Sequence, residues 1–560
     1  MWRHNYEPVA GSLMLSALVA AIPIIVLFVM LGILRKATWK AALAALGSAL
    51  VIALAVYGMP VGLALVSTLY GAAFGMFPIA WVVFASIMLY RLVVDAGKFE
   101  IIKDSVGNLT DDRRLQAIVI AFSFGAFIEG AAGFGAPVAV AGAMMVGLGF
   151  NPFFAAGLCL LANTAPVAFG SIGIPVVTLA NVTGLPLHGL SSMVGRLCAM
   201  VSVIIPGYLV VVMAGRKRAL EVLPAILACG LSFAATQFIV SNFVGAELTD
   251  ILSALVCIVV MVAVVRLWKP KTVMRLDSDG RATMALTRHG AGELFMAWMP
   301  YLLLVVFVLA WGVPAIKARL DAFTNSLLPA FLPRAAGLNA IAVPGLHNLI
   351  ERVPPVTGQP SPYGAVFTLN WLSASGSACF LATLVAALFL RVKPAAVVKA
   401  YTSTFKQLSF AMLTVASMLG LAYLMNYSGM TSTLGLALAS TGGVFPFFSA
   451  VIGWMGVFLT GSDTSANALF GNLQVVTANA LHLNPILMAS VNSAAGVMGK
   501  MISIQSIAVA VAATGLTQAD EGRLFRFTIK HSVLLMAVIG VFALLFAYVV
   551  PGLVPVAPGG

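Results

Sequence analysis

Long apolar runs separated by short polar segments form the main pattern of this chain. Most of these runs are close to the roughly 20 residues that a helix needs to cross a bilayer. The pattern therefore predicts an all-α, polytopic membrane protein. We expect spans at 11–34, 41–58, 70–94, 190–213, 222–244, 247–267, 295–312, 369–390, 405–426 and 529–551.

Two apolar stretches, 127–185 and 458–516, depart from this pattern because clusters of Gly, Pro and polar residues interrupt them. A helix that breaks at membrane depth leaves backbone N–H and C=O groups that lipid cannot satisfy, whereas a binding cavity can. Two such stretches in corresponding halves of a chain indicate a substrate site at a repeat interface. The repeat is supported by matches in order, namely Gly130 with Gly461, Asn151 with Asn484, Asn163 with Asn492, and Thr183 with Thr514.

The composition agrees with a membrane location. Hydrophobic residues make up 61% of the chain and charged residues 9%, and the mean hydropathy is +1.05. So little polar surface requires lipid as the solvent. The formal net charge is +13, but Lys and Arg gather in short loops between apolar runs, as expected for cytoplasmic loops. We therefore interpret the basic residues as a topology signal and expect no nucleic-acid partner.

Placing the basic loops in the cytoplasm predicts the direction of each broken segment. In the first half, a re-entrant hairpin at 115–148 enters from the cytoplasmic side and a discontinuous helix at 152–184 crosses outward. In the second half, a hairpin at 445–480 enters from outside and a discontinuous helix at 485–515 crosses inward. We therefore expect two inverted repeats, at 1–245 and 369–560, with connecting helices, a cytoplasmic loop and an outer linker at 246–368.

The two discontinuous helices carry the candidate substrate-binding residues. The first helix should break before Pro166, and a new half-helix should start near Ser171 with N-terminal N–H groups that suit an anion. Such paired breaks can hold a small carboxylate, although the same polar side chains could instead only repair the broken backbone. The candidates are Asn163, Thr164 and Ser171 in the first half, and Asn492, Ser493, Ser503 and Gln505 in the second.

Three charged residues lie far inside the apolar stretches. Lys500 is flanked on both sides by membrane-depth sequence, so it either pairs with an acid, meets a substrate anion or reaches toward an interface. Glu129 and Asp463 lie near the turns of the two predicted hairpins. Because burial favours the neutral form of a carboxyl group, either acid can bind and release a proton. We expect Glu129 or Asp463 to couple protons, and a purely structural role at the turn is the alternative.

Other chemistry has little support in the sequence. The five Cys residues lie in apolar segments without CxxC spacing, which indicates neither a disulfide framework nor a metal site. The segment GAAGFG at 130–135 has no strand before it and no GK[ST], so it does not predict a nucleotide loop. We expect no cofactor, no metal and no enzyme activity.

The broken stretches resemble those of the lactate permease family. The motifs that carry the resemblance are EGAAGFGAPVAVAG at 129–142, LANTAPVAFGSIGIPV at 161–176, TGSDTSANALFGNLQ at 460–474, VNSAAGVMGKMIS at 491–503 and LFRFTIKHS at 524–532. The resemblance implies a multi-pass carrier of the bacterial inner membrane that takes up L-lactate, and often D-lactate and glycolate, together with protons. It also implies inverted repeats with hairpins. Ile504 departs from the family pattern, which has Pro after KMIS, so the second break should be less sharp here.

Three alternatives to proton-coupled monocarboxylate transport stay open. Sodium could replace the proton, because unwound backbone carbonyls coordinate sodium readily. A proton-translocating subunit of a membrane redox complex would need more buried Lys and Glu than this chain has. A passive anion channel would carry lactate without regard to a proton gradient.

Overall fold

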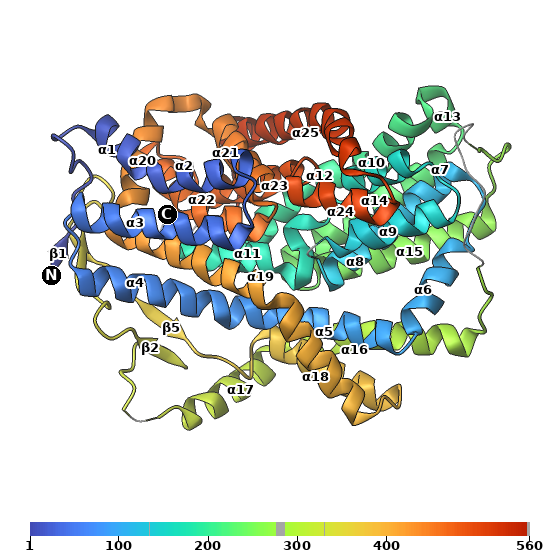
Figure 1. Cartoon of the computed structure of the whole chain (residues 1–560), viewed down its shortest axis with the longest axis horizontal. Coiled ribbons are helices and arrows are strands. Elements are labelled where there is room, and N and C mark those ends of the chain that lie inside the picture. Colours follow the sequence, from blue (N-terminus) through green and yellow to red (C-terminus); the bar gives the residue numbers. More distant parts are fainter. Residues whose placement is uncertain (134, 276–285, 330, 557–560) are drawn as a thin grey trace.

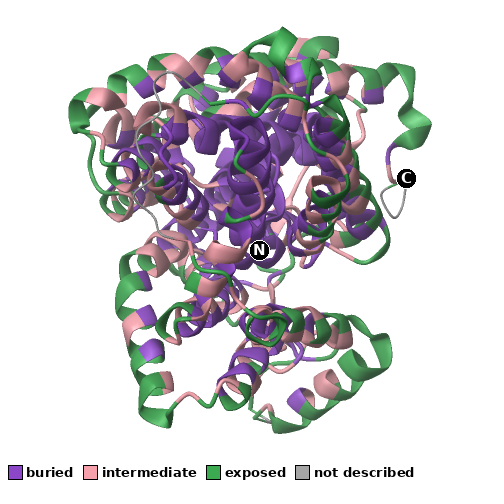
Figure 2. Ribbon diagram, turned by 90° about the vertical axis from the view of Figure 1, so that its right-hand side faces the viewer, coloured by how far each residue is buried: buried purple, intermediate pink, exposed green. Residues whose placement is uncertain are grey.

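In the computed structural model, the described residues are 1–133, 135–275, 286–329 and 331–556, and nearly all of their regular structure is helical. Twelve of the described helices are long and apolar enough to cross a membrane, and one further bent pair of helices passes the same test. The prediction of an all-α polytopic membrane protein is therefore confirmed. Buried residues fill the centre of the bundle, and exposed residues lie at its periphery (Figure 2).

The N-terminal part contains a short strand and a layer of helices at the left and lower edge of Figure 1. The segment from Val61 to Asp95 is helical except for a kink at Phe77, whose φ is −139° and ψ is 125°. Phe77 comes directly before Pro78, and a residue before proline disfavours helical backbone. This helical segment starts earlier than the predicted span at 70–94. The elements are β1 (Trp2–Arg3), α1 (Leu13–Ala20), α2 (Ile22–Phe28), η1 (Val29–Ile33), α3 (Thr38–Ala55), α4 (Val61–Phe74), η2 (Gly75–Ala80), α5 (Trp81–Asp95) and α6 (Lys98–Gly107).

The next segment folds back on itself. Helices α7 (Arg113–Gln116), η3 (Ala117–Phe124) and α8 (Gly125–Ala131) run into a break, and α9 (Ala136–Gly147) returns along them. Arg113 Nη1 donates a hydrogen bond to the Leu148 carbonyl at 3.0 Å, so the two ends of the fold-back meet. The apolar window within 113–131 is wholly buried by protein, which agrees with a segment that does not face lipid.

A bent pair of helices follows. Helix α10 (Pro152–Ala162) and the unit η4 (Val167–Phe169) with α11 (Gly170–Thr183) meet at an angle of 62°. The helices that come next are α12 (Leu187–Ala214), α13 (Arg216–Leu220), α14 (Leu223–Phe243), α15 (Thr249–Leu267), α16 (Ala291–Gly312) and α17 (Pro314–Leu327).

The segment expected to be an outer linker is more ordered than predicted. Besides α17 it contains β2 (Ala340–Ala342), β3 (Ile350–Arg352), β4 (Ser361–Pro362) and β5 (Val366–Thr368). Strand β2 pairs antiparallel with β5, and β3 pairs with β4 and, in parallel, with β1. The first residues of the chain are therefore tied to the linker by backbone hydrogen bonds.

The second half repeats the types of element seen in the first. Helix α18 starts at Ser375, later than the predicted span at 369–390, and the 35-residue α19 is longer than the predicted span at 405–426. The elements are α18 (Ser375–Phe389), α19 (Pro394–Ser428), α20 (Met430–Leu438), η5 (Ala439–Val444), α21 (Phe445–Thr460), α22 (Asp463–Ala480), α23 (Pro485–Lys500), α24 (Ile504–Thr514), η6 (Gln518–Asp520), α25 (Glu521–Leu544), η7 (Leu545–Val549) and η8 (Pro551–Leu553).

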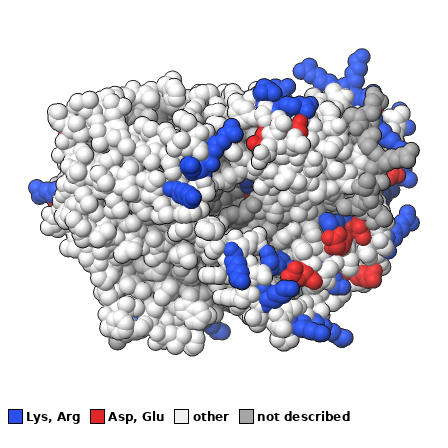
Figure 3. Space-filling view, viewed as in Figure 1, with Lys and Arg blue, Asp and Glu red and all other residues white. Residues whose placement is uncertain are grey.

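The broken segments of the two halves pack against each other at the centre of the molecule. Helix α11 lies against α22, α9 against α24, and α12 against α23 (Figure 1). Lys and Arg side chains gather on the right-hand part of the face in Figure 3, where α6, α7 and α13 lie, and few lie on the left. The inverted relation of the two repeats and their boundaries stay predictions.

Candidate functional site

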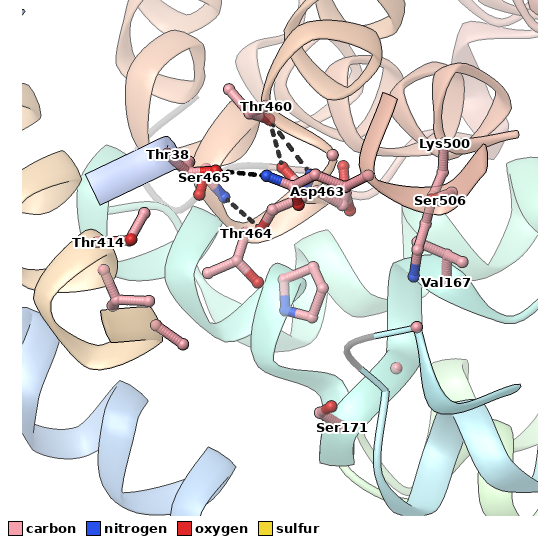
Figure 4. Close-up of a pocket in the computed structure, with 18 of the residues that line it drawn as sticks. Thr38, Val167, Ser171, Thr414, Thr460, Asp463, Thr464, Ser465, Lys500 and Ser506 are labelled. Carbon is pink, nitrogen blue, oxygen red and sulfur yellow. Dashed lines mark hydrogen bonds between the residues drawn. The ribbon is translucent and has the colours of Figure 1, made fainter. Parts of the chain in front are cut away.

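A cavity of about 340 Å³ lies where the interrupted segments meet. It is walled by the fold-back of α8 and α9, by the turn between α21 and α22, by the breaks in both discontinuous helices and by parts of α3 and α19 (Figure 4). The polar and charged lining residues are Thr38, Glu129, Ser171, Thr414, Thr460, Ser462, Asp463, Thr464, Ser465, Lys500, Gln505 and Ser506.

The first break has an unusual backbone. Helix α10 ends at Ala162 and a turn leads to Pro166, as the proline predicted. Ser171, Ile172 and Gly173 then have φ values of 46°, 61° and 71°. The right-handed backbone of α11 therefore begins after Gly173, which corrects the expected start near Ser171. A β-branched residue in this region is strained, and such strain typically occurs at functional sites.

The second break is gentler, as the presence of Ile504 predicted. Helices α23 and α24 continue as one apolar rod of 30 residues, interrupted between Lys500 and Ile504. The Ser503 hydroxyl caps α24 by accepting a hydrogen bond from the Ser506 N–H at 3.2 Å. Because Lys500 ends α23, its ammonium group lies near the negative end of that helix dipole.

Lys500 forms an ion pair with Glu129 across the cavity wall. Lys500 Nζ lies 2.9 Å from Glu129 Oε1, and the side-chain amide of Asn163 donates to Glu129 Oε2, also at 2.9 Å. Lys500 is 8% exposed and Glu129 3%. Gly170 leaves room for this carboxylate, because a Cβ there would lie 2.6 Å from Glu129 Oε1. The ion pair joins α8 of the first half to α23 of the second.

Asp463 is the second acid on the wall. It is the first residue of α22, after the N-cap Ser462. Its Oδ2 accepts hydrogen bonds from the Ser493 hydroxyl at 2.6 Å and the Asn467 amide at 3.3 Å. Its Oδ1 is buried without a hydrogen-bond partner among the described residues. Asn492 supports this contact indirectly, because its side-chain amide donates a hydrogen bond at 3.0 Å to Oδ1 of Asn467, the residue that donates to Asp463.

The structure divides the predicted site residues into two groups. Glu129, Ser171, Asp463, Lys500 and Gln505 line the cavity. The others lie behind its wall, where Asn163 and Ser493 hold the two acids and the Thr164 hydroxyl donates to the Leu161 carbonyl at 2.7 Å. Direct substrate contact stays a prediction for both groups, and the observed contacts of the second group position the wall residues. The residues of the second group are Asn163, Thr164, Asn492, Ser493 and Ser503.

Sequence reasoning missed the part of the wall that α3 and α19 provide. The ring of Trp39 stacks on that of Phe410, with centroids 5.5 Å apart and planes at 23°. Thr38 accepts a hydrogen bond from the Gln505 amide, which connects α3 to α24. Figure 4 shows Thr38 and Thr414 on the side of the cavity opposite Lys500. Thr38 and Trp39 lie in a short basic segment between two predicted spans, and Phe410 and Thr414 lie in an apolar run, so the sequence carried no local signal that they share a site.

The chemistry of the wall suits a small organic anion. Lys500 is the only Lys or Arg among the described lining residues, and Ser and Thr hydroxyl groups line the same cavity. An ammonium group and hydroxyl donors in a poorly hydrated cavity bind a carboxylate strongly. Within the described ranges, no group of three or more His, Cys, Asp or Glu side chains could hold a metal ion.

Known proteins resemble this chain over almost its whole length. The family model described as L-lactate permease matches residues 16–550. The chain is 46% identical over 564 residues to an L-lactate permease of Bacillus subtilis, covering 99% of this chain and 100% of the relative. It is 44% identical over 567 residues to the glycolate permease GlcA of Escherichia coli K12, covering 99% of each. Among solved structures, MtrF of Neisseria gonorrhoeae, titled an antimetabolite efflux pump, aligns at 12% identity and a TM-score of 0.47 over 89% of this chain and 86% of MtrF.

Proposed function

Because the chain belongs to the L-lactate permease family, a multi-pass protein group of the bacterial inner membrane, we propose that it imports short monocarboxylates by proton symport. L-lactate, D-lactate and glycolate are the proposed substrates. The relatives are named permeases, so the chain is a transporter and not an enzyme. The observation that carries the proposal is the ion pair between Lys500 and Glu129 on the wall of the central cavity.

The substrate carboxylate binds the Lys500 ammonium in place of Glu129. In the observed state one cation and one anion cancel at a separation of 2.9 Å. An arriving carboxylate would add a negative charge to a buried site, which is unfavourable unless a proton neutralises Glu129. Protonated Glu129 releases Lys500, and the substrate takes its position. One proton therefore enters with each substrate molecule.

Hydroxyl groups on the wall select short 2-hydroxy acids. Ser171 and Thr464 line the same cavity as Lys500. The Ser171 hydroxyl donates to the Ala132 carbonyl at 2.9 Å, so its oxygen can accept a hydrogen bond from the substrate hydroxyl. Asp463 disfavours a second carboxylate, because the wall has one cation to share between them. We therefore expect lactate and glycolate to compete with each other, and dicarboxylates not to compete.

The proposal is tested with purified protein reconstituted in liposomes, with labelled lactate added to the outer solution. A pH gradient and a sodium gradient are imposed separately. Proton symport requires accumulation with the pH gradient alone. Accumulation with sodium alone would assign the sodium-coupled alternative, and flux that ignores both gradients would indicate a channel.

Substitution of Glu129 by Gln tests which residue carries the proton. The amide imitates the protonated acid, so exchange of lactate across the membrane should continue while accumulation driven by the pH gradient is lost. Glu100→Gln is the matched control, because the Glu100 side chain is 67% exposed on α6. Full proton-driven accumulation by Glu129→Gln would remove Glu129 from the mechanism and leave Asp463 as the candidate.

A further inference from the structure

Asp250, the second residue of α15, lies buried behind the fold-back that carries Glu129. Its exposure is 1%, and neither of its carboxyl oxygens has a hydrogen-bond partner within the described residues. Asp250 is not among the described residues that line the central cavity. Asp250 belongs to none of the motifs by which the family was recognised.

The contact between Asp250 and the fold-back is close. A Cβ on Gly130 would lie 2.9 Å from the Asp250 Cβ and 3.0 Å from the Ile251 nitrogen. Helix α8 therefore packs against the start of α15 through backbone, immediately beside Glu129. Any movement of this fold-back changes the surroundings of Asp250.

A carboxylate in such a place is costly. Burying an ionised group without a partner is far less favourable than burying the neutral acid, so Asp250 holds a proton in this conformation. The nearby charges do not remove this conclusion. Lys500 is already paired with Glu129, and Glu129 itself repels a second negative charge.

Other ionisable groups around Asp250 are few. The segments η3 and α11, which pack against α15, contain none. Helix α14 contributes only Cys229, whose thiol lies 3.4 Å from that of Cys257 on α15 itself. The groups that face or flank Asp250 are Glu129 on α8, Lys500 on α23, Cys198 on α12, and Glu247 in the connection before α15.

We propose that Asp250 is a second proton-binding residue of the transport cycle and passes its proton to Glu129. The Asp250 O–H bond breaks and a Glu129 O–H bond forms, directly or through one water. The total charge of the two acids does not change, and Lys500 becomes free for the substrate. Asp250 takes its next proton from water before the loaded carrier moves, so that no ionised Asp250 is left buried without a partner and the loaded site stays neutral. This inference rests on the proposed proton symport.

The test compares wild type, Asp250→Asn and Asp95→Asn in liposomes. Asp95 is exposed at the end of α5, so its variant controls for the same chemical change. Proton and lactate fluxes are measured together under a pH gradient. We expect Asp250→Asn to lower lactate accumulation under a pH gradient at least ten-fold, whereas adding Asp250→Asn to Glu129→Gln, in which no proton has to reach residue 129, should leave lactate exchange at the level of Glu129→Gln alone. Unchanged accumulation by Asp250→Asn alone, or an equal loss of exchange in the Glu129→Gln background, would overturn the proposal, because a structural role lowers exchange in both backgrounds.

A second measurement does not depend on the variant folding. Infrared difference spectra of the wild type, with and without lactate, should contain the carbonyl band of a protonated carboxyl group that changes on binding. Absence of any such band would overturn the proposal. Where Asp250→Asn folds, loss of the band assigns it to Asp250. Failure of the wild type to respond to a pH gradient would instead refute the proposed symport.

Discussion

Removal of the Lys500 ammonium tests the central ion pair most directly. Lys500→Met keeps an apolar stem of similar length and leaves Glu129, which is 3% exposed, with the Asn163 amide as its remaining partner. Deleting one partner of a buried ion pair costs about 3–5 kcal/mol. The double variant Lys500→Met with Glu129→Gln removes both charges, so it should recover most of this loss.

Transport should separate from stability in the same set of variants. A hydrogen bond to a charged group contributes about 1.5–3 kcal/mol, so loss of the substrate contact should weaken apparent lactate affinity about 10- to 150-fold. Both the single and the double variant lose this contact. The double variant should therefore be stable but bind lactate poorly.

The measurements are thermal unfolding in detergent and the KM of lactate exchange in liposomes, since exchange needs no net proton movement. Lys217→Met is the control, because Lys217 is exposed on α13. A double variant that exchanges lactate with the KM of the wild type would refute substrate binding at Lys500. A single variant as stable as the wild type would show that Glu129 does not depend on the ion pair.

Three further predictions concern other parts of the molecule. Gly170→Ala should abolish lactate accumulation by displacing Glu129. Gly47→Ala should not, because an added Cβ there meets nothing within 4 Å, and uptake assays of both variants check this. A potassium diffusion potential without a pH gradient should drive no lactate accumulation, because substrate and proton cancel in charge. The hydrogen bond from His289 to Asp104 raises the pKa of the histidine. The stabilisation from this contact is therefore complete below the ordinary histidine pKa and is lost as pH rises through the raised pKa. The difference in unfolding temperature between wild type and His289→Gln should shrink as the pH is raised through that range.

Sequence reasoning found the features that local chemistry determines. Proline fixes where a helix must stop, so the interruption near Pro166 could be located. No proline marks the second interruption: the segment that matches the first break in sequence, Asn492 to Gly496, lies inside α23, and the chain is interrupted only after Lys500. A lone Lys inside a long apolar run needs a partner, and Lys500 has one. These signals depend on a few neighbouring residues and on the properties of lipid, and tertiary packing does not change them.

What sequence could not show is the direction in which each polar side chain points. Asn163, Asn492 and Ser171 carry the same prediction from sequence, yet the two asparagines lie behind the cavity wall, where Asn163 donates to Glu129 and Asn492 donates to Asn467. The wall residue Thr38 lies more than half the chain away from Gln505, its partner, and only packing brings them together. Asp250 has the sequence appearance of an ordinary acidic residue in the first turn of a helix.

The position of the ion pair across the two halves explains how coupling and movement can depend on one another. Glu129 belongs to the first fold-back and Lys500 to the end of α23, so their attraction holds segments from different halves together. If the carrier moved with Lys500 and Glu129 separated and both still charged, it would bury two unpaired charges, which is strongly unfavourable. Under the proposed proton symport, movement is therefore permitted either with the pair intact and the site empty, or with proton and carboxylate both bound. Substrate without a proton leaves an uncompensated anion, and a proton without substrate leaves an unpaired ammonium group, so neither half-loaded state moves readily.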